Sequence, residues 1–324
     1  MQTALITGIT GQDGFHLTKL LAKNNYKIIG ITSGADLKRL EYFKQLYPDV
    51  KIYKTNLLDM VKMENILNSE KPDEIYNLAA VSSVAMSIRE PELTHKINHE
   101  LVINLLNLIY SSKNSAKIKF YQSSSSEMFG GNEGKPINEN TEFRPVSPYG
   151  ESKAKAHIYC NEFRTKHKAF ISQGIMFNHE SEFRQPSFVS MKIIDNLINI
   201  KRNVIKNFEL GDIRPARDWG YAGDYVEAIY LMMKSEVPSD YVIASGKSYS
   251  IKEFVESAIA EIGLPGKIND YVRSDPGLIR KSEFFMCVGN PSKANAELHW
   301  KAKYDFHQLI RHISSHRELL IDIL

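Results

Sequence analysis

The N-terminal sequence constrains the fold most strongly, because a short apolar run leads directly into a glycine-rich turn. ALIT at 4–7 has the apolar character of a buried strand, and GITGQDG follows it at 8–14. The next segment, FHLTKLLAKN at 15–24, has the periodicity of a helix. Glycines in such a turn allow the backbone to approach a phosphate and the helix to pack closely on the strand. The helix N-terminus then offers free N–H groups to a pyrophosphate.

The glycine spacing is GxxGxxG, and its position between a first strand and a helix favours a dinucleotide site. A turn with a purely structural role is the alternative. The residues predicted to contact the dinucleotide are Gly8, Thr10, Gly11, Gln12, Asp13 and Gly14.

Strands and helices continue to alternate through the first half of the chain. Apolar runs at 27–31, 51–55, 74–80 and 117–124 are typical of strands, and HELVINLLNLIYSS at 99–112 is typical of a helix. This alternation indicates βαβ units and a buried parallel sheet. We predict an α/β fold, a Rossmann-like doubly wound parallel sheet with a smaller, mostly C-terminal substrate-binding lobe.

Polar loops punctuated by glycine and proline interrupt this rhythm after about residue 175. Helical patterns at 190–203 and 251–263 lie on either side of a strand-like run at 241–246. We predict a dinucleotide-binding domain over 1–177, to which segments near 212–245 return. The smaller lobe would consist of 178–211 and 246–324.

Composition narrows the class of protein further. The 324 residues carry a formal net charge of only +3, which gives no reason to expect nucleic acid or a membrane surface as a partner. The two cysteines, Cys160 and Cys287, lack metal-like spacing, so we expect no metal site and a reducing compartment. No apolar run reaches the roughly 18 residues that span a bilayer. We therefore expect a soluble, cytoplasmic protein.

The end of the second strand bears on which dinucleotide binds. An NAD site usually has a carboxylate there for the ribose 2′-OH, but this strand ends in Thr32 and Ser33, and the first carboxylate is Asp36. Thr32, Ser33 and the nearby Arg39 would suit a 2′-phosphate. The pattern favours NADP and leaves NAD open.

A second group of polar residues follows the fifth predicted strand. SSSSE at 123–127 ends that strand, and SPYGESK at 147–153 places Tyr149 and Lys153 four residues apart, on one face of a helix. A lysine ammonium beside a phenol lowers the pKa of the tyrosine and makes it a base near neutral pH. An isolated YxxxK pair is more often a surface feature. After a glycine turn and a hydroxyl-rich strand end, in this order along the chain, it favours a functional site instead.

Taken together, the motifs resemble the extended short-chain dehydrogenase/reductase superfamily and, within it, the GDP-mannose 4,6-dehydratase family. The resemblance is carried by GITGQDG, YNLAA, SSSExxG, SPYGESK, GIMFNHES and RDWGYAGDYVEA, and it extends from Thr7 to NPSKA at 290–294. NHES at 178–181 and RDWG at 217–220 are the most specific of these motifs.

The resemblance implies a reaction and assigns roles in it. Tyr149 would remove the proton of the sugar 4-OH, Ser125 would hydrogen-bond the 4-oxygen, and Lys153 would hold Tyr149 and the nicotinamide ribose. Glu127 would remove the C5 proton, and Glu127 or Ser126 would assist the departure of water from C6. Glu127 is the discriminating residue, because a 4-reductase or 4-epimerase needs no carboxylate there.

The resemblance also implies contacts with both ligands. Further cofactor contacts are expected from Asn56, Leu57, Leu78, Ala79, Ala80, Tyr149, Lys153 and His179. Contacts with a GDP-sugar are expected from Ser82, Asn178, Glu180, Ser181, Lys192, Arg217, Arg280 and Glu283. Long helices at 93–112 and 149–168 imply a homodimer or homotetramer.

Departures from the family pattern leave the substrate open. Thr32 and Ser33 replace a pair of arginines, Val81 and Ser83 replace larger polar groups, and Met191 replaces a basic residue. GDP-mannose, a modified GDP-hexose and a GDP-heptose all remain candidates. A nucleotide-sugar 4-dehydrogenase, 4-reductase or epimerase is the alternative enzyme, and a non-catalytic NADP-binding protein is the lesser one.

Overall fold

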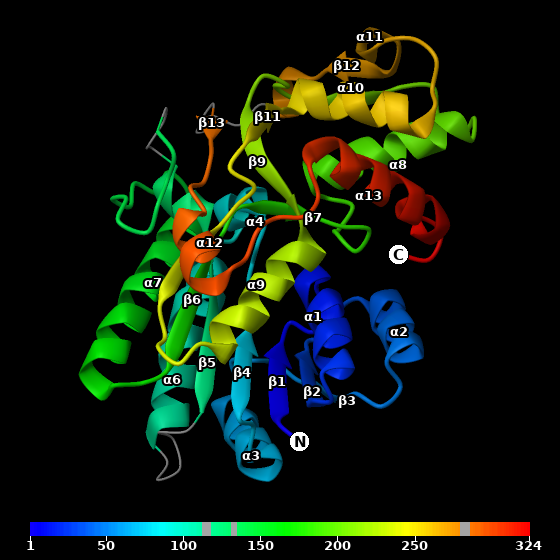
Figure 1. Ribbon diagram of the computed structural model, residues 1–324. Coiled ribbons are helices and arrows are strands. Elements are labelled where there is room, and N and C mark those ends of the chain that lie inside the picture. Colours follow the sequence, from blue (N-terminus) through cyan, green and yellow to red (C-terminus); the bar gives the residue numbers. More distant parts are fainter. Residues whose placement is uncertain (112–117, 131–134, 279–285) are drawn as a thin grey trace.

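A parallel sheet of seven strands forms the centre of the molecule (Figure 1). The computed structural model describes residues 1–111, 118–130, 135–278 and 286–324. From one edge to the other the strands are β10 (Asp240–Ile243), β6 (Ile171–Met176), β5 (Lys119–Ser125), β4 (Glu74–Asn77), β1 (Thr3–Thr7), β2 (Lys27–Thr32) and β3 (Lys51–Lys54), and all neighbours run parallel. The chain reverses its direction of winding between β1 and β4, so ligands are expected at the carboxyl ends of these strands.

The strands read as continuous apolar runs because helices cover both faces of the sheet. In β2, for example, every residue except Lys27 is buried. The predicted strand at 74–80 ends as a strand at Asn77, and the next residues continue toward the ligand edge as loop. The fifth strand was expected from residue 117, which lies outside the described residues, and pairing begins at Lys119.

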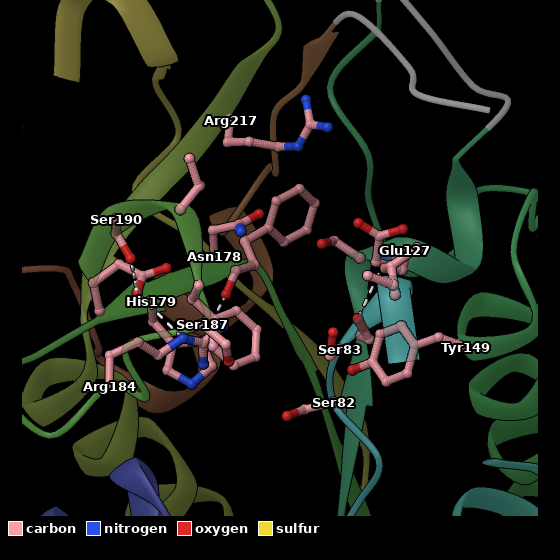
Figure 2. Close-up of a pocket in the computed structure, with 18 of the residues that line it drawn as sticks. Ser82, Ser83, Glu127, Tyr149, Asn178, His179, Arg184, Ser187, Ser190 and Arg217 are labelled. Carbon is pink, nitrogen blue, oxygen red and sulfur yellow. Dashed lines mark hydrogen bonds and ion pairs between the residues drawn. The ribbon is translucent and has the colours of Figure 1, made fainter. Parts of the chain in front are cut away.

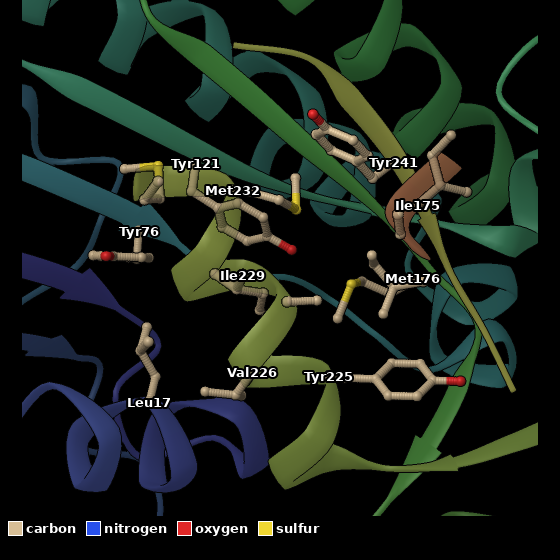
Figure 3. Close-up of a cluster of buried hydrophobic side chains, with 14 of the residues drawn as sticks. Leu17, Tyr76, Tyr121, Ile175, Met176, Tyr225, Val226, Ile229, Met232 and Tyr241 are labelled. Atoms are coloured by element: carbon tan, nitrogen blue, oxygen red, sulfur yellow. The ribbon is translucent and has the colours of Figure 1, made fainter. Parts of the chain in front are cut away.

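Two groups of helices build the two sides of the core. Leu17 of α1 (Gln12–Lys23) and Ile229 of α9 (Ala222–Lys234) pack on one face with Tyr76 and Tyr121 of the sheet (Figure 3). On the other face lie α3 (Met60–Glu70), α6 (Leu101–Ser111) and α7 (Pro148–His167). The remaining helices of this part are α2 (Leu37–Leu46), α4 (Val84–Arg89), α5 (Pro91–His95) and α12 (Ser292–Leu298). Of the helices described here, none is long and apolar enough to cross a membrane.

The helix expected at 99–112 begins as an α-helix two residues later than predicted, at Leu101. A π-helical turn, η1 (Lys96–Glu100), precedes α6, and residue 112 lies outside the described part of the chain. Asn98 lies in this turn, with its side-chain amide donating to the carbonyl of Val81 (3.1 Å) and accepting from the N–H of Val81 (2.9 Å). These bonds tie the irregular turn to the loop after β4.

A second lobe stands over the carboxyl edge of the sheet, at the top of Figure 1. Its own core joins α8 (Val189–Lys201), α10 (Ile251–Ile262) and α13 (Phe306–Leu320). Its short strands are β7 (Asn178–Glu180), β8 (Phe208–Leu210), β9 (Ala216–Tyr221), β11 (Ser248–Ser250), β12 (Val272–Ser274) and β13 (Met286–Cys287), with α11 (Ile268–Tyr271) and the 3₁₀ turn Pro276–Leu278 beside them. Ser250 and Glu253 form a capping box that starts α10.

The C-terminal half of the chain contributes to both cores. Trp219 of β9 packs in the second core, whereas Ala294, Leu298 and Trp300 pack in the first. β10 joins the main sheet. The division into a domain over 1–177, returning segments near 212–245 and a lobe formed by the remainder therefore stays a prediction about boundaries.

Candidate active site

A cleft of about 540 Å³ lies between the carboxyl ends of the main strands and the second lobe. Its walls come from the loop after β4, the end of β5, the start of α7, the segment from Asn178 to Lys192, and β9. Figure 2 shows that Glu127 and Tyr149 enter this cleft from one side, and His179 and Arg184 from the other.

The glycine turn lets the protein backbone come close to the phosphates of a dinucleotide. Gly8 has φ +68°, and a Cβ there would lie 2.9 Å from Cα of Ala79. A Cβ on Gly14 would lie 2.1 Å from the carbonyl oxygen of Ile9, so only glycine allows α1 to start against β1. A Cβ on Gly11 would come within 3.0 Å of Gly8 O. The resulting close turn, followed by the N-terminus of α1, is the arrangement that receives a pyrophosphate.

Asp13 and His179 join this turn to the NHES segment. Nε2 of His179 lies 2.9 Å from Oδ1 of Asp13, and the side-chain amide of Gln12 donates to the carbonyl of His179 (2.9 Å). Burial would raise the pKa of Asp13, but the charge of His179 lowers it to about 2. Burial opposes the charged imidazole, yet Asp13 holds the pKa of His179 above its usual value. The pair is an ion pair across the floor of the cleft.

Ser181 does not lie where a substrate contact was expected. Its side chain is fully buried and its hydroxyl donates to Oε1 of Gln12 (3.1 Å), so it supports the glycine turn. Ser181 is not among the residues that line the cleft, and its contact with a substrate stays a prediction.

The buried side chain of Arg39 also makes its hydrogen bonds within the protein. Only 3% of it is exposed; Nε donates to the carbonyl of Thr10 (2.6 Å), and Nη2 donates to the carbonyl of Phe183. The guanidinium thus links the glycine turn to the loop of Phe183, and its expected contact with a 2′-phosphate is not supported. Thr32 is also buried, with its hydroxyl 3.0 Å from that of Thr10, whereas Ser33 is exposed.

The other predicted cofactor residues lie around the same edge. Asn56 and Leu57 follow β3, and the side chain of Asn56 accepts from Leu58 N (3.0 Å). Leu78 and Ala80 line the cleft directly after β4. Of the whole predicted cofactor set, the residues that line the cleft are Asp13, Leu78, Ala80, Tyr149, Lys153 and His179.

The Ser–Tyr–Lys group is assembled by the end of β5 and the first turns of α7. Ser147 caps α7 by accepting from Gly150 N, and Pro148 occupies its first turn, so Tyr149 enters the helix next to the strand end. Lys153 lies one turn later, and its ammonium donates to the carbonyl of Ser123 (2.8 Å). All three predicted groups, Ser125, Tyr149 and Lys153, line the cleft.

The expected fall in the pKa of Tyr149 is wrong for the protein alone. Burial raises the pKa of Tyr149 to about 12, although a hydrogen bond with Ser125 opposes this rise. Burial also lowers the pKa of the Lys153 ammonium to about 8. Because Lys153 bonds to the strand and its Nζ lies 5.9 Å from the centre of the phenol ring, its charge does not offset the burial of the tyrosine.

The discriminating carboxylate lies in the same cleft. Ser126 and Glu127 begin the 3₁₀ turn that follows β5, and both line the cavity. The hydroxyl of Ser125 accepts from the N–H of Glu127 (3.2 Å), which fixes the turn. Arg217 of β9 enters the cleft from above (Figure 2). Arg280 and Glu283 lie outside the described residues.

The substrate side contains residues that the sequence reading missed. Ser82, Asn178, Glu180 and Lys192 line the cleft as predicted, and so do Arg184, Ser187, Phe188 and Ser190, which were not singled out. Arg184 stacks on the ring of Phe188 at 3.7 Å and pairs with Glu180 (3.2 Å). The polar loop FNHESEFRQP was the available signal, but nothing in its spacing separates Arg184 from an ordinary loop arginine.

The strand order, the glycine turn and the Ser–Tyr–Lys group define the class as an extended short-chain dehydrogenase/reductase. Solved structures share this fold over the whole chain. UDP-glucose 4-epimerase of Thermotoga maritima gives a TM-score of 0.88 at 21% identity, covering 99% of this chain and 100% of that one. dTDP-glucose 4,6-dehydratase of Bacillus anthracis gives 0.84 at 22% identity, covering 100% and 98%.

Sequence comparison then identifies the family: the chain belongs to the GDP-mannose 4,6 dehydratase family, whose sequence model matches residues 5–313. GDP-mannose 4,6 dehydratase 1 of Arabidopsis thaliana is 39% identical over 318 residues, covering 95% of this chain and 87% of the relative. GDP-mannose 4,6-dehydratase of Vibrio cholerae is 33% identical over 341 residues, covering 95% and 91%.

Proposed function

We propose that the protein is a nucleotide-sugar 4,6-dehydratase that converts GDP-mannose, or a related GDP-sugar, to its 4-keto-6-deoxy form. The observation that carries the proposal is the presence of Glu127 in the same cleft as Ser125, Tyr149 and Lys153. The family membership supports the same activity.

Each of these residues has a task that its position supports. Tyr149 takes the proton of the 4-OH, and Ser125, at the end of β5, hydrogen-bonds the 4-oxygen. Lys153 is held by the carbonyl of Ser123 and orients Tyr149 and the nicotinamide ribose. A bound nicotinamide cofactor supplies reversible hydride transfer, from C4 and back to C6, so the reaction involves no net redox change.

Glu127 performs the step that separates a dehydratase from its relatives. Once C4 is a ketone, the C5 proton is acidic, and the Glu127 carboxylate removes it. The same group, with Ser126 beside it, returns a proton to the departing C6 hydroxyl. General acid–base catalysis of this kind contributes typically about 10²–10⁴-fold to the rate.

For the cofactor we propose NADP, bound by the glycine turn. Ser33 is exposed at the end of β2, where an NAD site usually has a carboxylate. Asp36 caps α2 with one oxygen of its carboxylate, which accepts from Arg39 N (3.1 Å), so this nearest carboxylate is already engaged in starting the helix. Comparison of NADP and NAD dissociation constants tests this choice; tighter binding of NAD would reverse it.

We propose a homodimer or homotetramer for the assembly. Apolar side chains on two neighbouring helices support an interface: Ile88 of α4 is 53% exposed and Ile158 of α7 is 45% exposed. Multi-angle light scattering of the purified protein measures the subunit number, and a monomer at micromolar concentration contradicts the proposal.

One incubation separates the dehydratase from the other candidates. The pure protein is mixed with GDP-mannose in D₂O without added cofactor. A dehydratase yields a 4-keto-6-deoxy product with deuterium at C5 and no accumulated reduced nicotinamide. Net formation or consumption of reduced cofactor would indicate a 4-dehydrogenase or reductase, and an unchanged C6 with inverted C4 would indicate an epimerase.

Inactivity would also be informative. If no GDP-sugar of the series mannose, modified hexose and heptose turns over while the cofactor binds, the non-catalytic cofactor-binding protein is the better reading. The relative kcat/KM values across the series identify the substrate.

A further inference from the structure

Behind the reacting groups lies a buried chain of polar side chains that the proposed reaction does not use. His157 is on α7, one helical turn after Lys153 and two after Tyr149, so all three face the same strand. Nδ1 of His157 lies 2.8 Å from the hydroxyl of Ser124, and its Nε2 lies 3.5 Å from Oδ2 of Asp240 on β10.

The far end of this chain is firmly held. Arg164, also on α7, donates to both carboxylate oxygens of Asp240, at 2.8 and 3.1 Å. Gln173 of β6 donates to the carbonyl of His157 at 3.2 Å. The chain therefore ties together β5, α7, β6 and β10, the elements that carry or border the active groups.

Both ring nitrogens of His157 are used in this chain, one toward Ser124 and one toward Asp240. The carboxylate of Asp240 only accepts, so Nε2 of His157 carries the proton that faces it, while the Ser124 hydroxyl lies within reach of both Nδ1 (2.8 Å) and Oε1 of Gln173 (3.5 Å). Ser124 is 3% exposed, so these protein contacts, and not solvent, hold its hydroxyl.

Ser124 nevertheless lies between two residues that act in the cleft. The carbonyl of Ser123 receives the ammonium of Lys153, and the hydroxyl of Ser125 faces Tyr149. A shift of Ser124 along or across the strand moves both neighbours together. Displacements near 1 Å in such sites can cost about 10²-fold in rate.

We propose that His157 is a positioning residue that, through Ser124, holds the strand segment Ser123–Ser125 at the place where Lys153 and Tyr149 meet the sugar and the cofactor. The inference rests on the proposed dehydratase function. It assigns separate roles to adjacent serines: Ser124 fixes the strand, and Ser125 contacts the substrate.

Four variants test the chain. An asparagine at 157 can place its amide where Nδ1 lies, whereas a glutamine reaches toward Asp240 instead. We expect Ser124→Ala and His157→Gln each to lower kcat about tenfold with KM changed less than about twofold, and His157→Asn to retain most of the activity. The double variant Ser124→Ala/His157→Gln should be no worse than either single change, because both remove one contact.

Controls distinguish positioning from a purely structural role. His167→Asn changes an exposed histidine at the end of the same helix and should leave kcat unchanged. Urea unfolding reports the stability of every variant. Normal kcat in folded Ser124→Ala and His157→Gln, additive losses in the double variant, or equal losses in His157→Asn and His157→Gln would each overturn the proposal.

Cofactor affinity gives a readout that does not depend on turnover. Because Lys153 would hold the nicotinamide ribose, the dissociation constant of NADP should rise about fivefold in Ser124→Ala and His157→Gln but not in His157→Asn. If wild-type protein binds NADP without turning over a GDP-sugar, the dehydratase proposal fails while this series still decides the role of His157. No NADP or NAD binding by wild type would overturn both.

Discussion

Ser125, Glu127, Tyr149 and Lys153 meet in one cleft, and burial there disfavours the charged forms of both Tyr149 and Lys153. It raises the pKa of Tyr149 to about 12 and lowers that of Lys153 to about 8. The two pKa values therefore move apart, from ordinary values of 10.0 and 10.5, so in the protein alone Tyr149 is a neutral phenol at neutral pH and Lys153 gives up its proton more easily than in water. At the residue scale, the chemistry thus depends on how deeply each group lies.

Glu127→Gln tests the assignment of the C5 base. The amide keeps the shape of the turn after β5 but cannot accept a proton, so we expect deuterium exchange at C5 to fall at least about 100-fold. NADP affinity should stay within about twofold, because the glycine turn is untouched. The measurement is proton NMR of substrate and product in D₂O; normal exchange in the variant would remove Glu127 from the mechanism.

Asp13→Asn tests the ion pair with His179 through the pH dependence of stability. The folded-state pKa of Asp13, about 2, is below its ordinary value of 3.8, so its contribution is present above pH 4 and lost as the pH falls toward 2. The pKa of His179 is raised, so its contribution is present below pH 6.5 and lost as the pH rises through the higher folded value.

We therefore expect Asp13→Asn to lower the free energy of unfolding by about 2 kcal/mol near pH 5 and by much less near pH 2. Urea titrations at pH 2, 5 and 8 measure this profile. Asp49→Asn, an exposed carboxylate, is the matched control and should leave it unchanged. An equal loss at pH 2 and pH 5 would mean that the ion pair is not the cause.

At the scale of elements, the join of β1 to α1 depends on how closely the helix start approaches the strand. The carbonyl of Ile9 occupies the space that any side chain at 14 would need. A helix displaced here would also displace the N–H groups that face a pyrophosphate. Helix packing and pyrophosphate binding therefore both require glycine at position 14.

Gly14→Ala should lower the free energy of unfolding by about 1–3 kcal/mol, the usual cost of overpacking. NADP binding should weaken at the same time, since α1 must move away from the turn. Isothermal calorimetry and urea unfolding measure the two effects. Gly277→Ala is the control, since its added Cβ meets at 3.1 Å only the flexible carboxylate of Asp275. If folded Gly14→Ala binds NADP with unchanged affinity, close packing of α1 on β1 is not needed for cofactor binding and the prediction is wrong.

At the scale of the whole molecule, buried Arg317 joins two helices of the second lobe and reaches Glu182, the residue directly after the NHES segment. Arg317 of α13 is 1% exposed and donates to both carboxylate oxygens of Asp195 on α8, at 2.7 and 3.0 Å. It also donates to the carbonyl of Glu182 (3.3 Å), three residues after His179. The geometry of the cleft therefore depends on a residue near the C-terminal end of the chain.

Arg317→Met should destabilise the protein by about 3 kcal/mol or more, because it leaves the Asp195 carboxylate without its buried partner. The control is Arg202→Met, which breaks an exposed pair with Asp322 and should cost less than about 1 kcal/mol. Urea unfolding at neutral pH compares the two. Equal costs would show that the burial of Arg317 contributes nothing.

The sequence alone determined the parallel sheet, the glycine turn and the Ser–Tyr–Lys spacing, because each is a local pattern. Strand periodicity, the glycines at 8, 11 and 14, and the interval from Tyr149 to Lys153 all depend on residues close in the chain. The family, and the prediction that Glu127 is catalytic, also followed from short motifs in the sequence.

Only the tertiary structure decided where the polar side chains point. Arg39, Ser181 and Arg184 look alike in sequence as polar loop or helix residues, yet the first two are buried against the glycine turn and the third lines the cleft. The chain Ser124–His157–Asp240 joins residues up to 116 positions apart, counted from 124 to 240. Burial and long-range contacts set these orientations and pKa values, and neither can be obtained from local spacing.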